Sequence, residues 1–269
     1  MRFVTYDAGE GPRAGVLRDG DRVVEAGHSL RDLIAVSRLA EPPNAKEIAL
    51  SDAQLLPPIP DPDKIICIGL NYRSHAEEAG VEAPETPTFF AKFRNALVPA
   101  GTQVELPKAS QKVDYEAEVA FVVGRRAKDV SESDALDYIA GYTLLNDLSA
   151  RDLQFATPQW IPGKVFDGSA PCGPALVTPD EAGPPDAIEI ELRLNGEVMQ
   201  SASTADLIHS IPALLAHLSS LMTLEPGDIV STGTPSGVGS VREPRVWLKP
   251  GDEIEISSPS LGTLRSTLI

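Results

Sequence analysis

A short proline-rich stretch near residue 60 constrains the fold of this chain more than any other part of the sequence. Residues 57–62 read Pro-Pro-Ile-Pro-Asp-Pro. Because each proline fixes its own φ and lacks a backbone N–H, the stretch is incompatible with a helix and is predicted to be a stiff, extended connector. We therefore divide the chain of 269 residues into a small N-terminal domain over residues 1–60 and a larger domain over residues 61–269.

Patterns typical of short β-strands occupy most of both parts. In the first part they cover residues 1–6, 13–18 and 22–25, before a short helix that Ser29 is placed to cap. In the second part they cover residues 64–69, 115–123, 141–145, 187–194, 229–232, 245–248 and 253–256. The patterns predict an α+β chain that is mainly β, with short helices.

Two segments have helical patterns in the larger part. Residues 204–222 have one apolar stripe, but Pro212 falls inside it, so we expect two helices or a kink. Ser131, followed by Asp134, is expected to cap a helix that runs through Ile139.

The charge balance excludes some classes of partner. Lys and Arg total 23 against 39 Asp and Glu, for a formal net charge of −16. This disfavours nucleic acid and anionic membranes, both of which require a basic surface. No apolar run is long enough to span a membrane, and the N-terminus lacks the apolar core of a signal peptide. We expect a cytoplasmic protein in which Cys67 and Cys172 are reduced and structural.

Three acidic residues are candidate metal ligands. Glu116 and Glu118 stand two apart on a predicted strand, so both side chains point to the same face. Two such carboxylates repel unless a cation or hydrogen-bond donors compensate, and Mg²⁺ or Mn²⁺ prefers oxygen ligands. Asp147 follows an apolar run and could complete the site. Alternatively, the glutamates face water on an edge strand and Asp147 caps a turn.

Other candidates are weaker when each is taken alone. His75 and Glu78 lie at i and i+3 if their segment is helical, an arrangement that orients an imidazole for proton transfer. Lys164 could stabilise developing negative charge, and Arg151 could bind a carboxylate. Residues 231–239, STGTPSGVG, lack the lysine of a phosphate-binding loop, although Thr234 could still bind a carboxylate. Each of these residues could equally be an ordinary surface or turn residue.

The order of the motifs resembles the fumarylacetoacetate hydrolase family. The resemblance rests on GLNYRSHAEE, DYEAEVAFVVG, GYTLLNDLSARDLQ, PCGP, the segment STADLIHSIPALLAHLSSLMTLEPGD and STGTPSGVG, and it runs from about residue 64 to the C-terminus. It implies a rolled, mixed β-sheet catalytic domain in a homodimer, and residues 1–60 resemble the small N-terminal domain of many bacterial members.

The resemblance also implies roles for single residues. Glu116, Glu118 and Asp147 would bind Mg²⁺ or Mn²⁺, and His75 with Glu78 would activate water from a lid helix. Lys164 matches a lysine near the metal. The expected substrate contacts are Arg151, Thr234, Asn71 and Gln154.

Members of this family act on small 2-oxo acids through a metal-stabilised enolate. The intact His75–Glu78 pair favours hydrolysis of the C–C bond of a 2,4-dioxo acid of the acylpyruvate or fumarylpyruvate type. The alternatives are an oxaloacetate decarboxylase that uses the same metal site, and a decarboxylase or isomerase of 2-hydroxyhepta-2,4-diene-1,7-dioate. A more distant alternative is a metal-binding dimer without catalytic activity.

Overall fold

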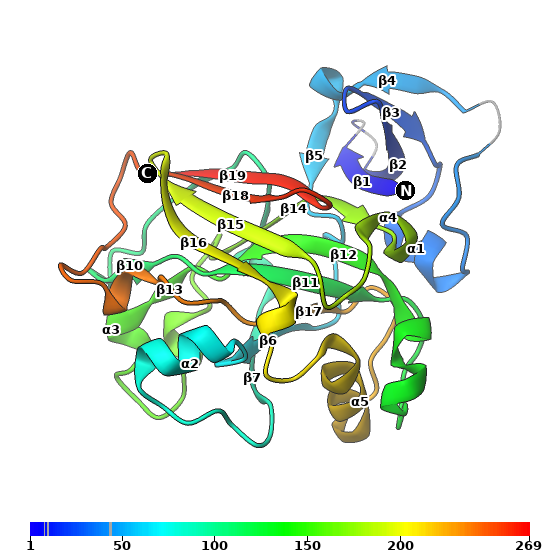
Figure 1. Ribbon diagram of the computed structural model, residues 1–269. Coiled ribbons are helices and arrows are strands. Elements are labelled where there is room, and N and C mark those ends of the chain that lie inside the picture. The colour runs from blue at the N-terminus through cyan, green and yellow to red at the C-terminus, as the bar shows by residue number, and fades with distance from the viewer. Residues whose placement is uncertain (8, 10, 43–44) are drawn as a thin grey trace.

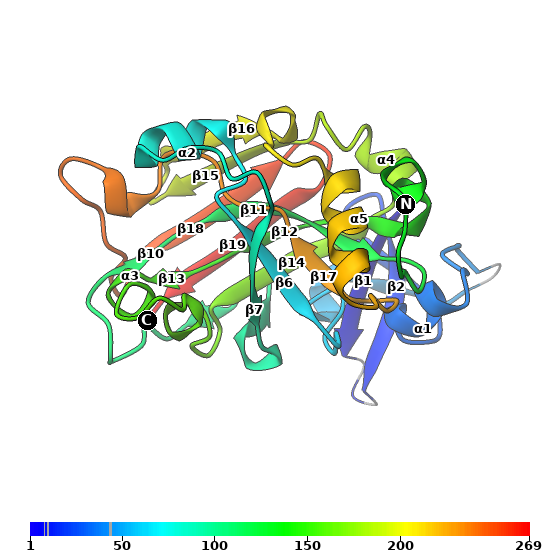
Figure 2. The ribbon, with the colours of Figure 1, turned by 90° about the horizontal axis from the view of Figure 1, so that it is seen from below.

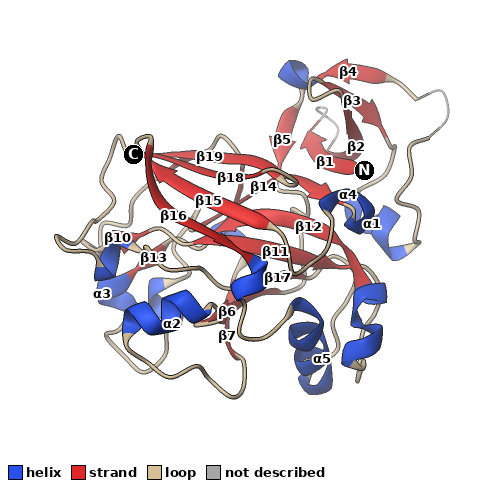
Figure 3. Cartoon of the chain, in the orientation of Figure 1, coloured by secondary structure: helices blue, strands red, loops and turns tan. Residues whose placement is uncertain are grey.

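Two large β-sheets pack against each other and form most of the molecule. The structure is a computed structural model that describes residues 1–269 except residues 8, 10 and 43–44. In Figure 1 the strands near the C-terminus, in yellow and red, lie across the green central strands, and the blue N-terminal strands extend to one side. Figure 3 shows that strands predominate and that the helices are short, as the sequence predicts.

The larger sheet contains both N-terminal and central strands. Its twelve strands are β1 (Arg2–Asp7), β2 (Pro12–Arg18), β3 (Arg22–Glu25), β4 (Glu47–Ala49), β5 (Gln54–Leu56), β6 (Ile65–Gly69), β7 (Thr88–Lys92), β8 (Leu97–Pro99), β11 (Ala117–Val123), β12 (Ile139–Asn146), β14 (Ala170–Val177) and β17 (Ile229–Ser231). The main path is β4-β3-β2-β1-β14-β12-β11-β17-β6-β7. Its pairs β17–β6 and β14–β8 are parallel and most others antiparallel, so the sheet is mixed, as expected.

The second sheet covers one face of the first. Its strands are β9 (Gln103–Val104), β15 (Glu189–Leu194), β16 (Glu197–Ser203), β18 (Glu253–Ser258) and β19 (Gly262–Leu268). A separate two-stranded sheet pairs β10 (Val113–Asp114) with β13 (Ser149–Ala150). Every residue of β11 and β12 is buried, which explains why these strands are apolar on both faces rather than alternating.

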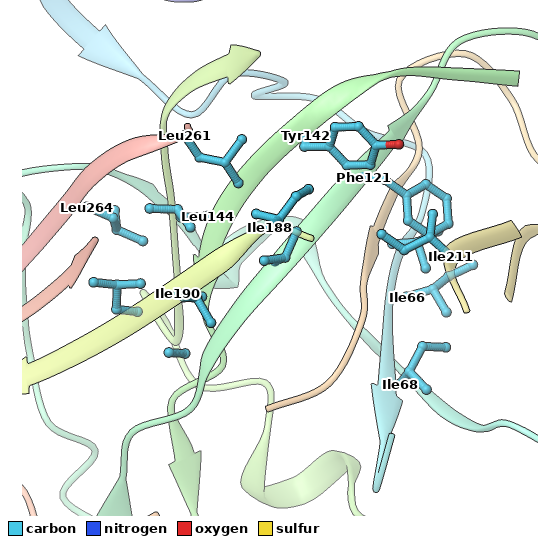
Figure 4. Packing of buried hydrophobic residues seen from close by; sticks show 14 of the residues in the cluster. Ile66, Ile68, Phe121, Tyr142, Leu144, Ile188, Ile190, Ile211, Leu261 and Leu264 are labelled. Carbon is cyan, nitrogen blue, oxygen red and sulfur yellow. The ribbon is translucent and has the colours of Figure 1, made fainter. Parts of the chain in front are cut away.

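Figure 4 shows the core between the two sheets. Leu144 of the larger sheet lies with Ile190 and Leu264 of the smaller one, whereas Phe121 lies beside Ile211, and all five side chains are buried. The other face of β11 and β12 packs with the short helix α1 (Leu30–Ala35) in a second cluster that includes Leu30, Val122 and Leu145. Cys67 and Cys172 are buried and free.

The helices lie outside the sheets, and Figure 2 shows α2 and α5 from below. They are α1 (Leu30–Ala35), α2 (Arg73–Ala79), α3 (Arg151–Gln154), α4 (Pro179–Ala182) and α5 (Ile211–Leu221), with 3₁₀ helices at Leu50–Asp52, Arg94–Ala96, Glu132–Tyr138, Ile161–Gly163, Thr204–Asp206 and Gly239–Val241. Within the described ranges, none is long and apolar enough to cross a membrane.

Several local predictions can be compared with the structure. Ser29 caps α1 as expected, accepting a hydrogen bond from the Asp32 amide. The segment 204–222 forms two helices, and Pro212 lies in the first turn of α5, where the missing N–H costs nothing. Residues 132–138 form a 3₁₀ helix, and the Ser131 hydroxyl donates to the Asp134 carboxylate instead of capping the backbone.

The predicted strand at residues 245–248 is wrong. The segment lies between Pro244 and Pro250, and only the amides of Val246 and Leu248 donate to backbone, to Gly239 and Val113. It is therefore a loop fastened at two points. The domain boundary at residue 60 remains a prediction. The strand β1 of the N-terminal part pairs directly with β14 of the larger part, so the two parts share one sheet.

The core packing predicts how two matched substitutions affect stability. Leu144 is completely buried between the sheets, whereas the Leu136 side chain is 45% exposed. Leu144→Ala should lower the free energy of unfolding by about 2–5 kcal/mol, because it leaves a cavity that the rigid sheets cannot close. Leu136→Ala should change it by less than about 1 kcal/mol. Chemical denaturation of both variants measures the difference, and equal effects would contradict this account of the core.

Candidate active site

The three predicted metal ligands meet where β11 begins and β12 ends. Glu116 precedes β11, Glu118 lies within it, and Asp147 follows β12. Because Ala117 pairs with Asn146, the Asp147 amide donates to the Glu116 carbonyl at 2.9 Å. One oxygen from each carboxylate lies within 4.8 Å of the others, and all three side chains are buried. Since β11 lies between β12 and β17, the alternative of an exposed edge strand is wrong.

Cations surround two of these carboxylates. The buried Lys164 ammonium donates to Glu116 Oε2 at 2.8 Å and to Asp147 Oδ2 at 2.7 Å. A second buried ammonium, that of Lys92, lies 2.6 Å from Asp147 Oδ1. The Arg151 guanidinium contacts Glu116 Oε1 at 2.7 Å. The Asp147 side chain is thus committed to two lysines and does not cap a turn.

Glu118 has no such partner. Its carboxylate accepts hydrogen bonds from the Ser231 hydroxyl and the Gly233 amide, but no ion pair joins it to a lysine or arginine in the described part of the chain. Burial, reinforced by the nearby Asp147 and Glu116 carboxylates, raises the pKa of Glu118 well above its ordinary value. The site therefore holds one buried carboxylate whose negative charge is not compensated by the protein.

Neighbouring opposite charges favour the ionised forms of Glu116 and Lys164. Burial alone would raise the pKa of Glu116, but Lys164 and Arg151 outweigh it and lower the pKa to about 2. Burial likewise opposes the charged form of Lys164, yet Asp147 and Glu116 raise its pKa above the ordinary value. Glu116 is therefore ionised and Lys164 protonated at neutral pH.

The donor set fits a hard divalent cation. Three carboxylates supply only oxygen ligands, the type that Mg²⁺ and Mn²⁺ prefer, and leave the remaining positions to water or substrate oxygens. An ion there would also supply the positive charge that Glu118 lacks. The residues present thus match the expected metal, and they do not distinguish Mg²⁺ from Mn²⁺.

His75 and Glu78 form a contact on the same face of α2. His75 Nδ1 lies 3.3 Å from Glu78 Oε2. Glu78 is itself fixed, because both its oxygens accept from the Gly237 amide at 2.9 and 3.1 Å. Gly237 has a φ of +102°, and a Cβ there would lie 2.1 Å from the Met199 carbonyl oxygen, so only glycine fits. The loop at 231–239 thereby fixes Glu78, and Glu78 in turn orients the His75 imidazole.

One cavity of about 530 Å³ connects these groups. His75, Glu116, Glu118, Lys164, Arg151, Gln154 and Thr234 all line it, together with apolar side chains that include Phe90 and Trp160. Nine of the ten predicted site residues can be placed around this cavity: seven line it, and Glu78 and Asp147 contact residues that do. Asn71 is the exception. Its amide bonds the Thr232 and His209 carbonyls and the His209 amide, so it fastens two loops instead of facing substrate.

Arg151 and Gln154 have less freedom than the sequence suggests. The Arg151 guanidinium donates to Asp114 at 2.9 Å and to the Gln154 side-chain oxygen at 3.0 Å, besides contacting Glu116. Asp114 is held in turn by the Gly239 and Ser240 amides. The guanidinium therefore stabilises the acidic cluster, but its buried Nη2, although it lies 2.9 Å from Asp114 Oδ2, makes no hydrogen bond.

The sequence did not reveal four residues that build the site. Lys92, Asp114 and Ser231 contact the acidic cluster or Arg151, and Gln200 donates to the Thr234 hydroxyl at 2.8 Å while accepting from the Ala117 amide. Lys92 ends the strand β7 beside exposed residues, and Gln200 comes from the second sheet. Neither has a local pattern that distinguishes it from a surface residue.

Several known proteins are similar to this chain. The model of the family "Fumarylacetoacetate (FAA) hydrolase C-terminal" matches residues 64–269. The "oxaloacetate tautomerase fahd2, mitochondrial" of Xenopus laevis is 37% identical over an alignment that covers 100% of this chain and 90% of the relative.

Two solved structures are similar over the whole chain. The fumarylacetoacetate hydrolase of Exiguobacterium antarcticum is 32% identical with a TM-score of 0.89, covering 100% of this chain and 99% of that one. The 2-hydroxyhepta-2,4-diene-1,7-dioate isomerase of Mycobacterium marinum is 32% identical with a TM-score of 0.85, covering 100% and 98%.

Removing the charge of Glu118 should weaken metal binding. Glu118→Gln keeps the shape and the hydrogen bonds but removes the carboxylate that lacks a cation, so the Kd for Mn²⁺ should rise more than about tenfold. Titration calorimetry measures it. Glu77→Gln, on the exposed side of α2, is the matched control and should leave the Kd unchanged. If both variants bind Mn²⁺ like the unmodified protein, the acidic cluster is not the metal site.

Proposed function

The chain belongs to the fumarylacetoacetate hydrolase family, and from this premise we propose that it is a metal-dependent enzyme that interconverts the enol and keto forms of a 2-oxo acid of the oxaloacetate type. The observation that carries the proposal is the shared cavity. It places a carboxylate cluster, a protonated lysine and an oriented histidine around one space that a small molecule can occupy. These are the groups needed to stabilise an enolate and to move one proton.

The metal site fixes the reacting end of the substrate. A divalent ion held by Glu116, Glu118 and Asp147 would supply positive charge to the carboxylate and the 2-oxygen of the acid. Lys164, which remains protonated, donates a hydrogen bond toward the same negative charge. Because Lys92 and Lys164 fix both oxygens of Asp147, the cluster is preorganised.

His75 moves the proton. In the enol-to-keto direction the O–H bond at the 2-hydroxyl breaks, its proton passes to solvent, and His75 delivers a proton to C3 to form the new C–H bond. In the reverse direction His75 removes a proton from C3. Glu78 orients the imidazole and stabilises its protonated form, and Gly237 keeps Glu78 in place.

The relatives favour this reaction. The Xenopus relative, which aligns over the full length, is named an oxaloacetate tautomerase, and the Mycobacterium marinum neighbour is named an isomerase. Both names describe reactions that move a proton without consuming water.

A cytoplasmic location and a homodimer remain predictions from the sequence.

Hydrolysis of the C–C bond of an acylpyruvate is the second candidate. The His75–Glu78 pair that favours it is present, and His75 lines the cavity, where the same imidazole could deprotonate water for attack on the distal carbonyl. Decarboxylation of oxaloacetate needs the metal and Lys164 but no attacking water.

One set of assays separates these reactions. Chelator-treated protein, with and without added Mg²⁺ or Mn²⁺, receives the enol form of oxaloacetate, and absorbance follows ketonisation while pyruvate release follows decarboxylation. Acetylpyruvate is tested in parallel for released pyruvate. We expect metal-dependent ketonisation to be the fastest reaction. Faster cleavage of acetylpyruvate would favour the hydrolase, and faster pyruvate release from oxaloacetate would favour the decarboxylase.

His75→Ala should separate catalysis from metal binding. The variant should lose about 10²–10⁴-fold in kcat for ketonisation because it lacks the proton donor, while the Kd for Mn²⁺ should stay the same because His75 is not a ligand. His217→Ala, on α5 and outside the cavity, is the control. Full activity of His75→Ala would show that the imidazole is not the proton carrier.

A further inference from the structure

A single side chain fastens the segment that joins α2 to β7. This connecting segment, residues 80–87, reads Gly-Val-Glu-Ala-Pro-Glu-Thr-Pro and forms neither helix nor strand. The His209 Nε2 lies 2.9 Å from the Pro84 carbonyl oxygen. Because a carbonyl only accepts, Nε2 carries the hydrogen and the imidazole is the donor. In the described part of the chain, residues 82–87 make no other hydrogen bond.

The backbone of His209 is itself held firmly. It precedes Ser210, which caps α5 by accepting a hydrogen bond from the Ala213 amide, and α5 packs its apolar face into the core. The His209 amide donates to the side-chain oxygen of Asn71 at 2.8 Å, and the His209 carbonyl accepts from the Asn71 side-chain nitrogen at 3.1 Å. The imidazole therefore reaches the connecting segment from a fixed position.

The residues before His209 hold the beginning of α2. The Ser74 amide, in the first turn of α2, donates to Asp206 Oδ2 at 3.0 Å. The Ile208 amide donates to the Asn71 carbonyl at 2.7 Å, just before the helix. In Figures 1 and 2 the short yellow 3₁₀ helix that ends at Asp206 lies beside α2. The segment 206–209 thus contacts the chain on both sides of α2.

The connecting segment restrains the last turn of α2. The Val81 amide donates to the Ala76 carbonyl at 3.0 Å, so Val81 is bound to the end of the helix. Val81 and His75 line the same cavity. Pro84 follows Val81 by only three residues, so a contact that fixes Pro84 also limits the movement of the helix that carries His75.

We propose that His209 is a positioning residue, whose imidazole fastens the connecting segment and thereby keeps His75 directed into the cavity. His209 is not among the described residues that line the cavity, so it acts only through α2. The restraint on α2 is independent of the reaction. Only its effect on turnover rests on the proposed function.

Two matched variants separate the hydrogen bond from the rest of the side chain. The amide nitrogen of glutamine lies as many bonds from Cβ as the histidine Nε2, whereas that of asparagine lies one bond nearer. His209→Gln should therefore keep the contact with Pro84, and His209→Asn should lose it. Both variants retain the His209 backbone bonds to Asn71, and equal Tm values would show that the global fold is unaffected.

Hydrogen–deuterium exchange of the protein without added metal measures the restraint directly. Peptides that cover residues 73–84 should exchange about fivefold faster in His209→Asn, the factor that one net hydrogen bond contributes to an equilibrium. The effect is partial because Ser74 and Glu78 still hold α2 through Asp206 and Gly237. His209→Gln should exchange like the unmodified protein. So should the control His217→Asn, which changes a histidine on α5 outside the cavity.

Turnover supplies the second readout. His209→Asn should lower kcat for ketonisation about fivefold, because His75 is aligned for a smaller fraction of the time, while KM and the Kd for Mn²⁺ stay within about twofold. His209→Gln should restore kcat. A general loss of stability would produce neither this separation of kcat from KM nor the recovery in His209→Gln.

The two readouts distinguish failure of the positioning role from failure of the function. Unchanged exchange in His209→Asn, or equally fast exchange in His209→Gln, would overturn the role of the imidazole. Faster exchange in His209→Asn with an unchanged kcat would show that the contact does not position His75. The expected exchange pattern without ketonisation by the unmodified protein would support the restraint on α2 and contradict the proposed function.

Discussion

Compensation of buried charge is the constraint on which the rest of this structure depends. Four carboxylates, those of Asp114, Glu116, Glu118 and Asp147, are buried together with the cations of Lys92, Lys164 and Arg151. Transfer of such groups out of water costs several kcal/mol each, and only close pairing recovers this cost. With one more carboxylate than cations, the cluster has its excess acidic group at Glu118, which either a proton or a metal cation can neutralise. The same imbalance that burdens the fold makes the acidic cluster suited to hold a metal cation.

A β framework suits this cluster because it fixes the charges before any ligand arrives. The register of β11 with β12 sets Asp147 beside Glu116, and the end of β17 supplies the Ser231 hydroxyl to Glu118. The loop that follows β17 also holds Glu78 through Gly237, whose carbonyl accepts from the Tyr115 hydroxyl. The helix that carries His75 is thereby tied to the segment that carries Glu116. The acidic cluster and the His75–Glu78 pair are positioned by one connected set of hydrogen bonds.

The sequence predicted those parts of the site that local periodicity determines. The two-residue spacing of Glu116 and Glu118 and the three-residue spacing of His75 and Glu78 become contacts because one strand and one helix place them. Lys92 is 55 residues away from Asp147, and Gln200 is 34 residues away from Thr234. Such pairs form only because distant segments become neighbours in the fold. No local sequence pattern predicts which segments these will be. Arg151 was correctly located near the site, but its partners could not be known before Asp114 was placed.

The contrast between residues at strand ends and residues in loops explains why membership of the family indicates the type of chemistry more firmly than the substrate. The acidic cluster lies at strand ends inside the sheet, where a change of one residue disturbs buried charge. Lys112, Arg245 and Trp247 line the cavity from loops outside the helices and strands. Loops of this kind can change length and charge without affecting the core. Proteins similar to this chain accordingly carry names as different as tautomerase, isomerase and hydrolase.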